Sequence, residues 1–178
     1  GIGNSVAATT RSRFAWLFVN LLTAVLASWV ISLFGATIEQ MVALAVLMPI
    51  VASMGGNAGT QTMTVAVRAL ATRSLGPVNA LRFTLRECAV GLLNGCLFAL
   101  IIGLFAWVWF GSDALGLIIG VAMVINLLAA ALAGILVPLA LDRFDIDPAV
   151  ASGTFVTTVT DVVGFFAFLG LATLWLGR

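Results

Sequence analysis

The chain consists largely of uncharged apolar stretches that are each long enough to cross a lipid bilayer. A helix needs roughly 20 apolar residues to span about 30 Å of hydrocarbon, and stretches of this length recur along nearly the whole sequence. Only 8% of the residues are charged and 62% are hydrophobic, which is far from the composition of a soluble domain. The sequence therefore predicts an all-α, polytopic membrane protein whose surroundings are the lipid bilayer.

The hydrophobic pattern predicts five membrane-spanning helices. The first stretch is full length and follows Arg11 and Arg13, so we expect a true span rather than a cleaved signal peptide. Because the chain begins with Gly1 rather than Met, we expect it to be a piece of a longer protein. Residues 1–178 are expected to form one transmembrane domain, with spans at residues 14–34, 41–70, 88–110, 115–141 and 150–174.

The arginines predict the orientation of these spans. The chain has no lysine or histidine, and its arginines lie before the first span, between the second and third, after the fourth, and at Arg178. Positive residues favour the cytoplasmic side, so the N-terminus is predicted to be cytoplasmic and the C-terminus outside. The arginines therefore mark which side of the membrane each connection lies on. Because they do not form a basic surface, we expect no nucleic-acid partner. Four tryptophans fall towards the predicted outer ends, as interfacial anchors do: Trp29, Trp107, Trp109 and Trp175.

Asp161 is the most informative single residue, because it lies deep in the fifth predicted span. It follows Pro148 by about 13 residues, or roughly 20 Å along a helix axis. A carboxylate at that depth costs at least ~2.5 kcal/mol on insertion scales, so it should face a wet cavity or a partner. The spans offer no obvious Lys or Arg partner, which favours a cation. A protonated Asp161, hydrogen-bonded between helices, is the structural alternative.

Small and polar residues accompany Asp161 on its helix and recur in the second span. Helical spacing places Gly153, Thr157 and Gly164 on the face of Asp161. In the second span, polar side chains follow a spacing of about one turn, and Pro49 with Gly55 and Gly56 is predicted to interrupt the helix and free carbonyl oxygens. This polar stripe consists of Ser53, Asn57, Gln61 and Thr64.

Oxygen ligands with one carboxylate per chain favour a hard cation. The sequence has no histidine, and neither Cys88 nor Cys96 is near the stripe. Magnesium is the leading candidate, because it keeps much of its water and is held by one or two carboxylates; calcium, manganese, sodium and protons remain open. No HExxH or GxSxG motif and no second deep carboxylate supports an enzyme. Two further features predict contacts between helices: the amides of Asn94 and Asn126 are expected to form interhelical hydrogen bonds, and the small-xxx-small pairs Gly91/Gly95 and Gly116/Gly120 are expected to allow close packing.

Two segments resemble the MgtE-type magnesium transporter and channel family. Residues 49–61, with the core Met-Gly-Gly-Asn-Ala-Gly-x-Gln, are similar to that family's second transmembrane helix. Residues 147–153, followed by Thr157, Thr158 and Asp161, are similar to its fifth helix. The resemblance covers essentially the whole chain. The sequence departs from the family at Thr154, where a proline is often found.

The resemblance implies a channel-like pore along the axis of a homodimer in the bacterial inner (plasma) membrane. The Asp161 carboxylates of the two chains would bind hydrated Mg²⁺, with Thr157 contributing and Gly55, Gly56 and Asn57 beside the pore. Cytosolic regulatory domains are implied to lie outside this chain. The alternative is a carrier for another divalent cation, coupled to sodium or protons.

Overall fold

The computed structural model describes residue 3 and residues 5–177, and its helices account for nearly all of them. Five helices are long and apolar enough to cross a membrane, as the sequence predicts: α1, α3, α4, α5 and α6. A short helix, α2, lies in the connection between α1 and α3 and was not expected from the sequence. The elements are α1 (Val6–Ser32), α2 (Gly35–Gln40), α3 (Ala43–Ala71), α4 (Ala80–Phe110), α5 (Asp113–Arg143) and α6 (Pro148–Leu176).

Local capping residues fix several helix ends. Ser112 accepts a hydrogen bond from the Leu115 backbone N–H at 3.1 Å at the start of α5. Asp147 accepts one from the Ala149 N–H at 3.0 Å, directly before Pro148 opens α6. Gly111 ends α4 with a φ of 65°, a left-handed conformation that suits glycine. The helices therefore extend past most of the predicted span boundaries, because capped turns continue beyond the purely apolar stretch.

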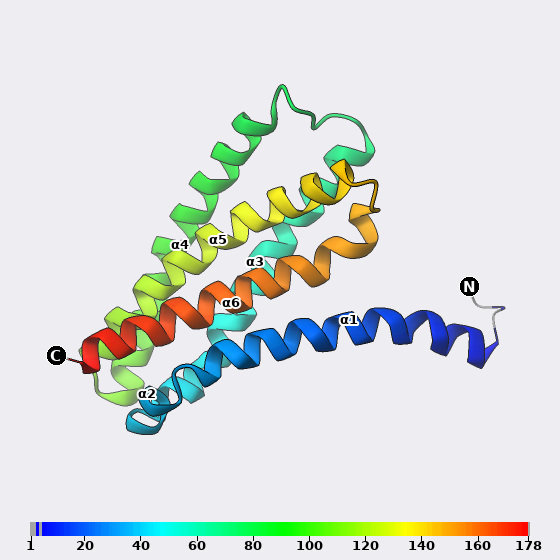
Figure 1. Ribbon diagram of the computed structural model, residues 1–178. Coiled ribbons are helices and arrows are strands. Elements are labelled where there is room, and N and C mark those ends of the chain that lie inside the picture. Colours follow the sequence, from blue (N-terminus) through cyan, green and yellow to red (C-terminus); the bar gives the residue numbers. More distant parts are fainter. Residues whose placement is uncertain (1–2, 4, 178) are drawn as a thin grey trace.

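Helix α5 forms the centre of the bundle. Helices α3, α4 and α6 all pack along it, whereas α1 packs mainly along α6 (Figure 1). Most side chains of α5 are buried, while α1 and α4 expose much of their apolar surface, as helices that face lipid do. The N-terminal half of α1 diverges from the bundle in Figure 1, and its side chains there are almost all exposed.

Small residues allow α4 and α5 to approach closely. A methyl group on Gly116 would lie 2.5 Å from the Gly103 carbonyl oxygen, and one on Gly95 would lie 3.1 Å from Val124 Cα. Gly91 and Gly120 make similar contacts across the same interface. The small-xxx-small prediction is thereby confirmed.

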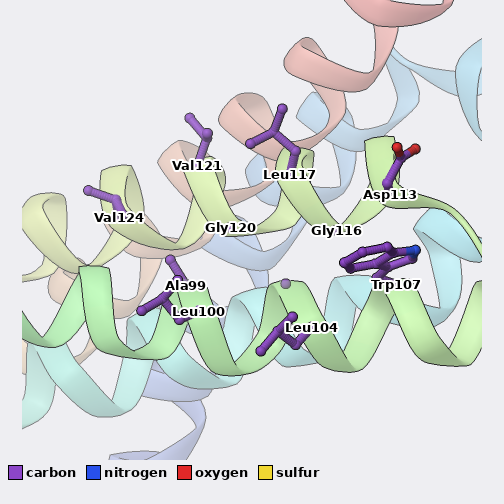
Figure 2. A pocket seen from close by; sticks show the side chains of 11 residues that line it. Ala99, Leu100, Leu104, Trp107, Asp113, Gly116, Leu117, Gly120, Val121 and Val124 are labelled. Atoms are coloured by element: carbon purple, nitrogen blue, oxygen red, sulfur yellow. The ribbon is translucent and has the colours of Figure 1, made fainter.

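An apolar groove of about 380 Å³ runs along the outer part of this interface, with Trp107 and Asp113 near one end (Figure 2). Leucine, valine, alanine and glycine line the rest of it. None of the residues predicted to bind a cation borders this groove. The apolar groove is therefore distinct from the predicted cation site.

The predicted interruption of the second span is wrong. Helix α3 is continuous from Ala43 to Ala71, through Pro49, Gly55 and Gly56. Its glycines serve packing instead: a methyl group on Gly59 would lie 2.7 Å from Val156 Cγ1 of α6. A proline withdraws one backbone N–H from the helix, and α3 stays helical on both sides of Pro49 because it is clamped by α5 and α6.

The two ends of the bundle differ in composition. The α3–α4 and α5–α6 connections lie at one end, towards which α1 also begins (Figure 1). The arginines among the described residues belong to the segments that reach this end, whereas Arg178 lies outside the described residues. The opposite end carries Trp29, Trp107, Trp109 and Trp175. The described arginines and these four tryptophans thus lie towards opposite ends of the bundle, as the sequence predicts.

Candidate cation-binding groove

An open groove of about 350 Å³ lies between α3 and α6, near the middle of both helices. It differs from the apolar groove of Figure 2 because hydroxyl, amide and carboxylate groups line it. The lining residues are Ala52, Ser53, Gly56, Asn57 and Thr60 of α3, with Thr157 and Asp161 of α6.

Asp161 supplies the only carboxylate of the groove lining. Its side chain is half-buried, and no described residue donates a hydrogen bond to it or pairs with it as an ion. A protonated Asp161 would form a hydrogen bond to a neighbouring helix. No such bond is present among the described residues. The carboxylate oxygens are therefore free to bind a ligand that enters the groove.

Thr157 lies one turn before Asp161 and brings a hydroxyl to the same groove. Its Oγ1 donates to the carbonyl oxygens of Gly153 at 2.9 Å and Thr154 at 3.1 Å. A hydroxyl has one proton and two lone pairs, so this oxygen can still accept. Gly56 faces it from α3, where a methyl group would lie 3.9 Å from Thr157 Cγ2. The absent side chain of Gly56 keeps the groove wide at the level of Thr157.

The wall contributed by α3 also presents oxygen atoms. Asn57 Nδ2 donates to Ser53 Oγ at 3.3 Å, which orients the amide and leaves Asn57 Oδ1 without a recorded partner among the described residues. Thr60 Oγ1 donates to the Gly56 carbonyl oxygen at 2.8 Å. Hydroxyl, amide and carboxylate oxygens are the ligands that Mg²⁺ and Ca²⁺ prefer, directly or through water.

Four of the five predicted metal-site residues line this groove: Gly56, Asn57, Thr157 and Asp161. Gly55 does not, because successive helix residues point about 100° apart, which turns it towards the buried amide of Asn126 on α5. Gly164, predicted on the Asp161 face, is also buried against Asn126. Two residues of the predicted α3 stripe, Gln61 and Thr64, are likewise not part of the groove lining.

Asn126 supports the groove from behind, a role that the sequence did not indicate. It is fully buried, and its Nδ2 donates to the Val51 carbonyl oxygen at 3.1 Å, which confirms the predicted interhelical hydrogen bond. A methyl group on Gly164 would lie 2.7 Å from the same Nδ2, and one on Gly55 would overlap it. One side chain of α5 thus contacts both α3 and α6 beside the groove. In the sequence, the only signal for this contact is an amide in one predicted span together with glycines in two other spans.

One chain does not enclose a metal ion. The described residues contain no group of three or more His, Cys, Asp or Glu side chains that could hold one. The groove is open and offers a single carboxylate, so a divalent cation there would keep much of its water or take further ligands from elsewhere.

Comparison with known proteins gives one consistent family. Residues 48–171 match the MgtE family model, described as a divalent cation transporter. The matched residues include both walls of the groove. Three curated relatives carry the name magnesium transporter MgtE: that of Bacillus subtilis, 30% identical over 90% of this chain; that of Enterococcus faecalis, 35% identical over 92%; and that of Thermus thermophilus, 36% identical over 93%.

The match covers most of this chain but only part of each relative. The aligned region is 36% of the length of each of the three curated proteins. The family model and the relatives describe transporters rather than enzymes. The five spanning helices agree with a multi-pass membrane domain. On these grounds the chain belongs to the MgtE family of divalent cation transporters.

Proposed function

We propose that this domain transports Mg²⁺ across the membrane and that Asp161 binds the ion on its way. The observation that carries the proposal is the free Asp161 carboxylate in an oxygen-lined groove at the middle of the bundle. An intramembrane carboxylate without a cationic side chain is stable when water or a cation reaches it. The name of the three relatives supports Mg²⁺ as the cation.

The ion in this proposal is hydrated. Mg²⁺ loses its water reluctantly and is usually held by one or two carboxylates, with water completing the shell. The groove of about 350 Å³ has room for an ion with water around it. Thr157, Asn57 and the backbone beside Gly56 then hydrogen-bond to that water, while Gly55 acts indirectly by allowing the contact between α3 and Asn126.

The groove is completed by a second copy of the chain. One carboxylate neutralises half of the charge of Mg²⁺, and the open side of the groove leaves the ion exposed. A two-fold axis parallel to α3 and α6 brings two such grooves face to face, so that both Asp161 carboxylates meet the same ion. The pore in this proposal is therefore lined by α3 and α6 of a homodimer.

The arginine-rich end of the bundle is the cytoplasmic end in this proposal. The N-terminal end of α1 then lies inside and the C-terminal end of α6 outside, in the inner membrane of a bacterium. Mg²⁺ moves inward, because a negative interior attracts a divalent cation through a pore.

Transport into liposomes tests the role of Asp161. We expect Asp161→Ala and Asp161→Asn to reduce Mg²⁺ flux at least about tenfold, since a binding energy of ~1.4 kcal/mol corresponds to that factor. Asp113→Asn is the matched control: Asp113 borders the apolar groove of Figure 2 and should transport like the unsubstituted protein. Unchanged flux in both Asp161 variants would contradict the proposal.

The second candidate is a carrier for another divalent cation, coupled to sodium or protons. The family description favours keeping it, because it names divalent cations without specifying magnesium. Flux measured with Mg²⁺, Mn²⁺ or Co²⁺, each with and without an imposed sodium or proton gradient, separates the two. A pore gives flux that depends on the membrane potential and the Mg²⁺ gradient alone.

A further inference from the structure

The apolar groove between α4 and α5 has no part in the function proposed above. It begins beside Trp107 and Asp113, at the end of the bundle that carries the tryptophans, and reaches Ala99 of α4 and Val124 of α5 (Figure 2). Asp113 and Val124 are 11 residues apart, or roughly 16 Å along the axis of α5. One leaflet contributes half of the roughly 30 Å of hydrocarbon in a bilayer, so the groove is about as long as one leaflet is deep.

Glycines form the floor of this groove. A methyl group on Gly103 would lie 3.1 Å from the Gly116 carbonyl oxygen, and one on Gly120 would lie 3.3 Å from the Ala99 carbonyl oxygen. The larger side chains therefore stand above the contact as two walls, formed by Leu100, Leu104 and Trp107 of α4 and by Leu117, Val121 and Val124 of α5. In a membrane such a channel is filled by hydrocarbon, because an empty one forfeits the dispersion contacts of its walls.

The dimensions of the groove favour one lipid acyl chain over a helix of another protein. A volume of about 380 Å³ spread over roughly 16 Å gives a cross-section of roughly 25 Å². A helix about 10 Å wide has a cross-section of about 80 Å², so a helix can lie across the groove without entering it. A single extended hydrocarbon chain is narrow enough to enter the groove and to follow it to its end.

The mouth of the groove indicates the kind of headgroup. Asp113 is exposed there, and its Oδ1 accepts a hydrogen bond from the Ala114 N–H at 2.7 Å, which orients the carboxylate. The half-exposed indole of Trp107 lies at the same end of the groove (Figure 2). A carboxylate pairs with an ammonium group, and the face of an indole attracts a cation. An anionic headgroup without an ammonium group is repelled by the same carboxylate.

We propose that this groove binds one phospholipid with a primary ammonium headgroup, of which phosphatidylethanolamine is the representative. One acyl chain lies in the groove, and the ammonium group pairs with Asp113 beside Trp107. The bound chain covers the glycine contact between α4 and α5 from the membrane side. Because α3 and α6 form the candidate cation groove, the lipid lies outside the proposed ion pathway.

Native mass spectrometry tests this site on the full chain, released from bilayers with equal amounts of phosphatidylethanolamine and phosphatidylglycerol that carry identical acyl chains. We expect one retained lipid per chain and a preference of roughly fivefold for phosphatidylethanolamine. Asp113→Asn keeps the shape of the side chain and its acceptor for Ala114, so it should retain a lipid without preference. Glu39→Gln is the matched control, because it removes an exposed acid of α2 at the same end of the bundle and should keep the preference.

Variants that fill the groove test the position of the acyl chain. Val121→Phe should lose the retained lipid, whereas Leu136→Phe, on an exposed part of α5 outside the groove, should keep it. If Val121→Phe does not fold, as its melting temperature would show, Leu104→Phe fills the same groove from α4. The proposal is overturned if the unsubstituted protein retains no lipid or both lipids equally, or if Asp113→Asn keeps the preference. Oxidative cross-linking of two chains through Leu100→Cys would identify a second copy as the occupant and overturn it as well.

Discussion

Gly55 and Gly56 are adjacent in the sequence and have different roles in the structure. Gly56 borders the groove opposite Thr157, whereas Gly55 is buried against the amide of Asn126. A side chain at each position therefore disturbs a different property: groove width at Gly56 and helix packing at Gly55. Single substitutions can separate these effects.

Gly56→Leu is expected to reduce Mg²⁺ flux strongly while leaving the fold intact. The new side chain would begin 3.9 Å from Thr157 Cγ2, an ordinary contact, and its remaining atoms would extend into the groove. Flux in liposomes and the melting temperature of the same preparation would be compared. Gly170→Leu is the control, because a side chain there also meets open space and Gly170 lies on the opposite face of α6 from Asp161. Normal flux in Gly56→Leu would show that ions do not pass this groove.

Asn126→Ala is expected to destabilise the protein by about 1–3 kcal/mol, because it removes a buried hydrogen bond to Val51 and leaves a cavity. Gly55→Ala alone should also destabilise, since its methyl group overlaps the Asn126 amide. The double variant should be more stable than the sum of both effects predicts, because the methyl group occupies the vacated space. Thermal unfolding of the four proteins gives the coupling, and strict additivity would refute this contact.

At the scale of single elements, the sequence predicted spans well and their regularity poorly. Length and hydrophobicity determine whether a helix can cross the bilayer, so five spans could be recognised. Pro49, Gly55 and Gly56 suggested a broken helix, because those residues weaken an isolated one. The helix is continuous in the structure because its glycines are in contact with α5 and α6. The sequence of α3 alone does not reveal these contacts with other helices.

The candidate groove was predictable in part for the same reason. Asp161, Thr157, Gly56 and Asn57 could be chosen from depth, spacing and resemblance. The position of Gly55 behind the groove and the role of Asn126 depend on how α5 is rotated relative to α3 and α6. Helix rotation follows from interlocking side chains of three helices, and the almost uniformly apolar α5 shows no face by itself.

The interface between α4 and α5 provides a prediction for a pair of elements. Gly116→Ala should destabilise the protein by roughly 1–3 kcal/mol, because its methyl group would lie 2.5 Å from the Gly103 carbonyl oxygen, which cannot move without its helix. Gly170→Ala adds the same methyl group to α6 where nothing lies within 4 Å. Equal melting temperatures for the two variants would contradict the close approach of α4 and α5.

For the whole molecule, the proposed dimer can be tested by cross-linking. Ser53 is exposed and borders the groove, so Ser53→Cys should form a disulfide between two chains in the membrane once Cys88 and Cys96 are replaced by serine. Leu100→Cys, exposed on α4 beside the apolar groove of Figure 2, should stay monomeric under the same oxidation. Cross-linking through Leu100 alone would place the interface on the opposite side from the proposed pore.

The central place of α5 also has a consequence for the order in which the molecule assembles. Helices α4 and α5 are consecutive and pack tightly, so their contacts close a short stretch of chain and can form early. The walls of the groove come from α3 and α6, about 100 residues apart in sequence, and Asn126 has its second glycine neighbour only when Gly164 has been synthesised. A nascent chain that stops before α6 therefore has the packed α3, α4 and α5 helices but only one wall of the groove.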